Sequence, residues 1–165
     1  MKKYTELKKA GAKFLKECKD NVGILFDDDG DGVTSAAILL AYFRQEKIKA
    51  KIVCGDIGKE HFDAFSKMKF DHYITCDLGV GQNPEYLDGL IGKHVMILDH
   101  HTVNVNLNAN GFLFVNPRIE KPKAYISTAH IAYDVCKLAG LKGFKWVSRI
   151  GMASDREIKG VKDEL

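Results

Sequence analysis

Short apolar segments that stop at an aspartate are the feature that most constrains this chain. Residues 22–26 form a continuous apolar run that ends at Asp27, and similar runs lead to Asp56, Asp77 and Asp99. Such runs are typical of strands buried on both faces. Because the carboxyl ends of parallel strands share one edge of a sheet, we expect these carboxylates to gather there. Their mutual repulsion would be relieved most simply by a polyvalent metal cation.

Helical patterns separate the apolar segments. The predicted strands are residues 22–26, 50–54, 73–76, 94–98 and 112–115. The predicted helices are residues 4–18, 33–46, 60–68, 127–138 and 144–154, with a short one opening at Asn83-Pro84. Regular alternation of the two predicts an α/β fold, a doubly wound and mostly parallel sheet with helices on both faces.

Length and composition predict a single domain over residues 1–165. The chain is 45% hydrophobic, which suffices for a core, and no apolar run approaches the ~18 residues of a membrane span. The net charge of +3 is too small to indicate a nucleic-acid partner by itself.

Cysteine usage favours a cytoplasmic protein. The four cysteines form no CxxC pair, so we expect reduced thiols at Cys18, Cys54, Cys76 and Cys136. Residues 162–165 (KDEL) match a retrieval signal of the endoplasmic reticulum. We interpret this match as chance, because no secretory signal is visible at Met1.

The first acidic motif is the segment 27–32, DDDGDG, which holds four carboxylates. Its glycines permit a turn that brings several carboxylates to one point. A solvated turn is the alternative interpretation, but clustered charge after a buried strand is costly without a partner.

Histidines follow a second strand end in the triplet Asp99-His100-His101. Imidazole together with carboxylates suits Mn, Fe or Zn, whereas oxygen ligands alone favour Mg or Ca. Asp77 and Asp155 are further candidate ligands, although Asp155 alone is equally well explained as a helix cap.

Residues 29–33 (DGDGV) also resemble the phosphatase signature of the haloacid dehalogenases. In that alternative one aspartate attacks phosphate and the second is the acid/base. It requires the nucleophile directly at the strand end, and it leaves His100 and His101 without a role.

Taken in order, the motif 27–32, Asp77, the triplet 99–101 and Asp155 resemble the four motifs of the DHH phosphoesterase family. Residues 116–118 (NPR) and 151–155 (GMASD) are most similar to its RecJ-like nuclease branch of archaeal type. The resemblance covers nearly the whole chain and implies the fold of the family's N-terminal domain. Many relatives carry histidine at the position of Asp27. Nucleases of this family usually continue into a second, substrate-binding domain, which we expect to be absent here.

The resemblance implies two divalent cations, with Mn²⁺ preferred to Mg²⁺. The two cations would lie ~3.5–4 Å apart and hold the attacking and leaving oxygens between them. The implied ligands are Asp29, Asp31, Asp77, His100 and Asp155, with Asp77 as bridge and Asp27 as a further ligand. Asp99 would orient an imidazole. His101 would donate to a phosphoryl oxygen, and Arg118 would contact a second phosphate.

We therefore expect a RecJ-like exonuclease that hydrolyses single-stranded nucleic acid, with DNA ahead of RNA. Relatives with the same cluster also act on short RNA, cyclic dinucleotides and pyrophosphate, and others are replication-complex scaffolds with decayed motifs. A non-catalytic subunit, or a split enzyme whose second domain is a separate polypeptide, is thus an open alternative. A polyanion could be held by Lys121, Lys123, Arg149, Arg156, Lys159 and Lys162, which are equally well explained as solvated surface.

Overall fold

A five-stranded parallel sheet forms the centre of the protein. The computed structural model describes residues 3–157, so Lys159 and the KDEL segment lie outside the described residues. The strands are β1 (Val22–Asp27), β2 (Ala50–Gly55), β3 (His72–Cys76), β4 (Val95–Leu98) and β5 (Leu113–Val115). They pair in the order β2-β1-β3-β4-β5, and every pair is parallel. The predicted strands are all confirmed.

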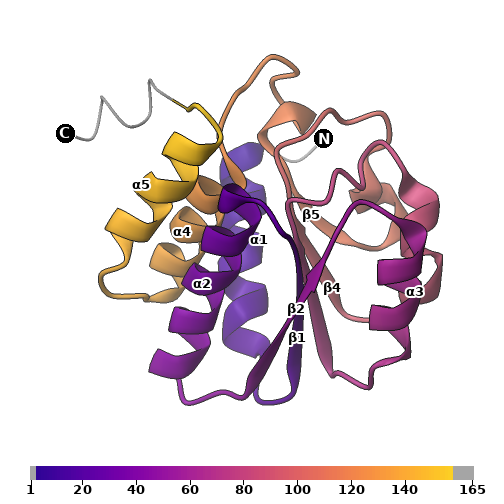
Figure 1. Ribbon diagram of the computed structural model, residues 1–165, viewed down its shortest axis with the longest axis horizontal. Coiled ribbons are helices and arrows are strands. Elements are labelled where there is room, and N and C mark those ends of the chain that lie inside the picture. The colour runs from indigo at the N-terminus through magenta and orange to yellow at the C-terminus, as the bar shows by residue number, and fades with distance from the viewer. Residues whose placement is uncertain (1–2, 158–165) are drawn as a thin grey trace.

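Helices cover both faces of this sheet (Figure 1). The α-helices are α1 (Tyr4–Glu17), α2 (Gly30–Gln45), α3 (Lys59–Lys67), α4 (Thr128–Ala139) and α5 (Lys145–Ser154). Short 3₁₀ helices are η1 (Pro84–Leu90), η2 (Leu107–Asn110) and η3 (Pro117–Ile119). Helices α1, α2, α4 and α5 pack together on one face, and α3 packs with η1 on the other. The doubly wound α/β fold is therefore confirmed.

The strand order reverses between β1 and β3. The chain leaves β1 for β2 on one side, then crosses back over β1 to form β3 on the other. In doubly wound sheets a crevice opens at this switch point, outside the carboxyl ends of the strands. Asp27 ends β1 and Asp77 directly follows β3, so both stand at the crevice.

Helix α2 begins at Gly30, three residues before the predicted start at residue 33. The prediction was wrong because the acidic turn itself is the start of the helix. Asp29 is its N-cap, and its Oδ1 accepts the backbone N–H groups of Asp31 and Gly32 at 2.9 and 2.8 Å. Gly32 is required here, since a Cβ at this position would collide with the backbone carbonyl of Asp27.

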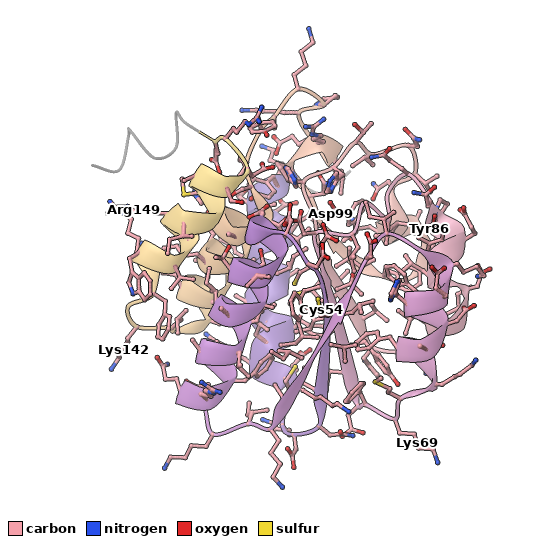
Figure 2. The ribbon with its side chains drawn as sticks, viewed as in Figure 1. Cys54, Lys69, Tyr86, Asp99, Lys142 and Arg149 are labelled. Carbon is pink, nitrogen blue, oxygen red and sulfur yellow. The ribbon has the colours of Figure 1, made fainter. Side chains whose placement is uncertain are left out.

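The core is apolar and continuous across the sheet. Ile52, Ile24, Ile74 and Met96 stand in register on neighbouring strands, and the last three are fully buried. All four cysteines are unpaired. Cys54 is exposed on the edge strand β2 (Figure 2), whereas the other three are buried. No helix within residues 3–157 combines the length and hydropathy needed to cross a bilayer.

Candidate metal centre

The crevice at the carboxyl ends of the strands brings the six predicted ligands together with His101, which was predicted as a donor to the substrate. Three sets have ligand atoms within 4.8 Å of one another: Asp77, His100 and His101; Asp31, His100 and Asp155; and Asp27, Asp29 and Asp77. The first two sets share His100, and the first and third share Asp77. Figure 2 shows the neighbouring Asp99 at this upper end of the strands.

Asp31 lies at the start of α2 and is held by the N-terminus of α4. Its carboxylate accepts the backbone N–H of Thr128 at 2.7 Å and that of Ala129 at 2.8 Å, and the side chain is fully buried. The first N–H groups of a helix have no partner within the helix, and the helix dipole favours an anion there. The start of α4 therefore fixes an acidic residue that comes from another helix.

Asp77 is buried immediately after β3 and is held by the same turn of α4. The Thr128 hydroxyl donates to Asp77 Oδ1 at 2.8 Å. The backbone of Asp77 has φ 65°, in the left-handed region that residues other than glycine rarely adopt. This conformation turns the chain away from β3 and leaves the carboxylate in the crevice.

His100 lies between two carboxylates. Its Nε2 is 3.4 Å from Asp77 Oδ1, and its Nδ1 is 3.5 Å from Asp155 Oδ2. Among residues 3–157, both His100 Nδ1 and Asp155 Oδ2 are buried without a hydrogen-bond partner. Burial lowers the pKa of His100, so the ring is neutral and can act as a ligand. Asp155 is the C-cap residue of α5 and belongs to one of the three ligand sets.

Asp99 orients His101, as the sequence predicted for one of the imidazoles. The Asp99 Oδ1 atom lies 2.8 Å from His101 Nδ1 and also accepts the His101 backbone N–H at 2.9 Å. This hydrogen bond raises the pKa of His101 to about 9, against the opposing effect of burial. At neutral pH the ring is therefore charged, with its Nε2–H available as a donor.

The segment 116–118 places Arg118 near this histidine. Asn116 is buried, donates to the His101 carbonyl at 3.0 Å and accepts the Arg118 backbone N–H at 2.8 Å. Arg118 itself reaches Thr102 at 3.4 Å, and a surface hollow of about 290 Å³ opens beside it. Since the guanidinium has further donors, it can contact an anion here.

The electrostatics of the cluster favour a bound cation. Burial raises the pKa of Asp77 to about 9, with added effect from Asp31 and Asp99. Burial likewise raises the pKa of Asp31 to about 7 and raises that of Asp27. Two buried acceptors that have no hydrogen-bond partner among residues 3–157, Asp155 Oδ2 and Asp99 Oδ2, lie in the same region. The mixed carboxylate and imidazole set fits a divalent transition metal such as Mn²⁺.

Not every predicted residue joins the cluster. Asp56, expected at the same edge, is exposed and accepts the N–H of Ile57, outside the three ligand sets. Arg149 lies on the outer side of α5 in Figure 2, whereas Asp99 lies at the strand ends. Arg149 therefore lies away from the strand ends where the cluster is.

Sequence reasoning missed the residues that support the ligands. Glu157 is buried and accepts the Ser127 backbone N–H at 2.9 Å, and its other oxygen lies 3.0 Å from His130 Nδ1. It thereby ties the chain after Asp155 to the start of α4. Tyr125, just before α4, also contacts the site. A serine at the start of a helix signals a cap, but no sequence signal shows which distant acid the free N–H groups will bind.

The chain belongs to the DHH family: the model of the DHH family N-terminal domain matches residues 21–157. This confirms the resemblance drawn from the four motifs. A comparison with curated protein sequences gave no match.

Solved structures with the same fold include RecJ in complex with Mn²⁺ from Thermus thermophilus, with 22% identity and a TM-score of 0.75 over 91% of this chain. A second, exonuclease RecJ bound to manganese, has 20% identity and a TM-score of 0.70 over 94% of the chain. CDC45 from Entamoeba histolytica has 16% identity and a TM-score of 0.69 over 98%. The chain spans 24%, 43% and 37% of these three proteins.

Proposed function

We propose that this protein is a divalent-metal-dependent phosphodiesterase, a RecJ-like exonuclease that hydrolyses single-stranded nucleic acid. The observation that carries the proposal is the convergence of carboxylates and imidazoles from four parts of the fold at the switch point of the sheet. Membership of the DHH family and the fold shared with two manganese-bound RecJ structures support it.

In this proposal the ligands of two divalent cations, Mn²⁺ ahead of Mg²⁺, are Asp27, Asp29, Asp31, Asp77, His100 and Asp155. Asp77 would be shared between the cations, since it belongs both to the set with His100 and His101 and to the set with Asp27 and Asp29. A bound divalent cation supplies positive charge to phosphoryl oxygens and lowers the pKa of a water. The hydrogen bonds from Thr128 and Ala129 keep two of the carboxylates in place before any cation arrives.

The groups around the ligands handle the substrate. His101, charged and oriented by Asp99, donates its Nε2–H to a phosphoryl oxygen as negative charge develops there. Arg118 contacts a neighbouring phosphate, which its open position beside the 290 Å³ hollow supports. Asn116 fixes the relative position of these two donors because it is bonded to both segments.

The decisive experiment compares two strand-end carboxylates. D77N should lose at least about 100-fold of Mn²⁺-dependent hydrolysis of a labelled single-stranded oligonucleotide, and with it the rise in melting temperature on adding Mn²⁺. D56N, at the exposed aspartate outside the ligand sets, should keep both. Normal cleavage by D77N, or activity that survives excess chelator, would refute the proposal.

The same assay separates the possible substrates. We expect DNA to be cleaved faster than RNA of the same sequence, and both faster than a cyclic dinucleotide. Preferential hydrolysis of cyclic or very short oligonucleotides would instead support the small-nucleotide phosphodiesterase alternative.

The second candidate is a non-catalytic or split-partner subunit of a DNA replication or repair complex. The fold similarity to CDC45 favours it. The complete ligand set weighs against loss of catalysis. We propose that residues 1–165 act as one catalytic domain and that a separate polypeptide strengthens substrate binding. We also propose a cytoplasmic location, which the unpaired thiols support. Activity that appears only with a partner protein would establish the split form.

A further inference from the structure

Tyr125 is an exposed aromatic residue directly beside the ligand cluster. It lies in the segment between η3 and α4, the orange segment near the upper ends of the strands in Figure 1. Its ring centroid is 5.9 Å from that of His100 with the planes at 79°, and its hydroxyl donates to the Asp155 carbonyl at 2.5 Å. Nevertheless 49% of the residue is exposed.

These contacts fix the ring without covering it. The hydroxyl bond holds the far end of the side chain, and the edge-on contact with the imidazole holds one side. A single exposed apolar residue needs no explanation in general. This one differs because its orientation is set by contacts to two candidate ligands, so binding a flat partner would cost little conformational entropy.

The charges around the ring suit a polyanion. Lys121 and Lys123 are exposed on the same segment, and Arg118 lies just before it. Tyr125 itself meets the acidic cluster through its contacts with His100 and Asp155. A strand that places one phosphate at the cluster can therefore keep neighbouring phosphates near cationic side chains.

We propose that Tyr125 is the stacking platform for the nucleobase next to the scissile phosphate, so that the site selects nucleotides over phosphoesters without a base. This inference rests on the proposed function and adds the specificity-determining residue to it. An aromatic platform tolerates any sequence, because every base has a flat face on which to stack. A base paired in a duplex has no free face, so the platform also favours single-stranded ends.

The test compares Y125L and Y125F on two oligonucleotides of equal length. One carries normal bases, and the other has an abasic residue at the terminal position and the same phosphodiester. Y125L should raise KM at least about 5-fold on the normal strand, with little change in kcat or in the abasic reaction. Y125F retains the ring but loses the hydroxyl bond to Asp155, so its KM on the normal strand should rise less than that of Y125L.

A separate measurement of binding makes the result independent of hydrolysis. Fluorescence anisotropy in excess chelator should show that the wild type binds the normal strand more tightly than the abasic one, and that Y125L does not. Equal wild-type binding of the two strands, or equal losses by Y125L on both, would overturn the inference. A Y125F defect as large as that of Y125L would assign Tyr125 to positioning Asp155 instead. If the wild type hydrolyses neither strand, the proposed function fails, while the binding measurement still decides the role of Tyr125.

Discussion

At the scale of single residues, the metal centre depends on side chains that are not ligands themselves. Thr128 contributes its hydroxyl to Asp77 and its backbone N–H to Asp31, so one residue holds two carboxylates. Substituting it with valine removes only the first of these bonds. The side chain keeps nearly the same shape, which makes the hydroxyl testable by itself.

We expect T128V to bind Mn²⁺ about 10- to 100-fold more weakly than the wild type, the usual cost of removing a partner of a metal ligand. Isothermal titration of Mn²⁺ measures this change. T128S should restore most of the affinity. The matched control is T75V, because Thr75 is also buried nearby on β3 and its hydroxyl has no hydrogen-bond partner within residues 3–157. Wild-type affinity in T128V would show that the hydroxyl does not position Asp77.

A histidine at the opposite end of the sheet makes stability depend on pH. Burial lowers the pKa of His72 below its ordinary value of 6.5, helped by the neighbouring His94. The His72 ring packs edge-on against Phe14 at 5.4 Å, and its Nδ1 is buried without a partner in the described chain. The unfolded chain therefore binds a proton more readily than the folded one.

Stability should accordingly be complete above the ordinary pKa of 6.5 and decrease as the pH falls below that value toward the lowered pKa. H72F keeps an aromatic ring against Phe14 but cannot be protonated, so it should lose less stability than the wild type between about pH 7.5 and 5.5. Urea denaturation at each pH measures the difference. Parallel pH profiles for the two proteins would contradict the assignment.

At the scale of elements, α2, α4 and α5 meet at the site through small residues. Gly151 of α5 packs against Thr34 of α2 and Ala129 of α4, and a Cβ at this position would collide with both. The same Cβ would lie 3.0 Å from Asp31 Oδ1. The close approach of the helices is what allows Asp155 at the end of α5 to face His100.

We expect G151A to destabilise the protein by about 1–3 kcal/mol, the range for overpacking a close-packed interior. It should also weaken Mn²⁺ binding, because the added methyl group presses on Asp31. I150A on the exposed side of the same helix should change the free energy of unfolding by less than about 0.5 kcal/mol. Urea denaturation of both variants is the measurement, and equal stabilities would contradict the packing argument.

The sequence was sufficient to predict the strands, the α-helices and the candidate ligands that lie together, but not the contacts that join them. Apolar runs and helical spacing predicted each strand and each α-helix, because burial patterns are local, but not the short helices η2 and η3. The start of α2 was misplaced because Asp29 was interpreted as a ligand and not also as a helix cap. The hydrogen bonds from Thr128 and Ala129 to Asp31 join residues nearly a hundred positions apart in the sequence. Asp56 and Asp77 both follow apolar strands, and they differ in whether the surrounding structure buries them. Such distinctions come from tertiary packing, which single-sequence patterns do not contain.

At the scale of the whole molecule, stability should decrease from the middle of the sheet to its edge. Ile74 on β3 and Ile52 on β2 both align with Ile24 of β1, but Ile74 is fully buried and Ile52 is 43% exposed. We expect I74A to cost about 2–5 kcal/mol and I52A less than about 1 kcal/mol. Comparable losses in urea denaturation would show that β2 is as firmly packed as the centre.

The left-handed backbone of Asp77 has a consequence for how such domains evolve. Both its conformation, φ 65°, and its buried charge are unfavourable to folding. Glycine at this position would remove both costs, so folding alone does not retain the aspartate. Selection for the proposed metal-dependent activity would then be what keeps it. In a lineage freed from that selection, Asp77 should be among the first residues to drift, leaving a stable scaffold that no longer performs chemistry.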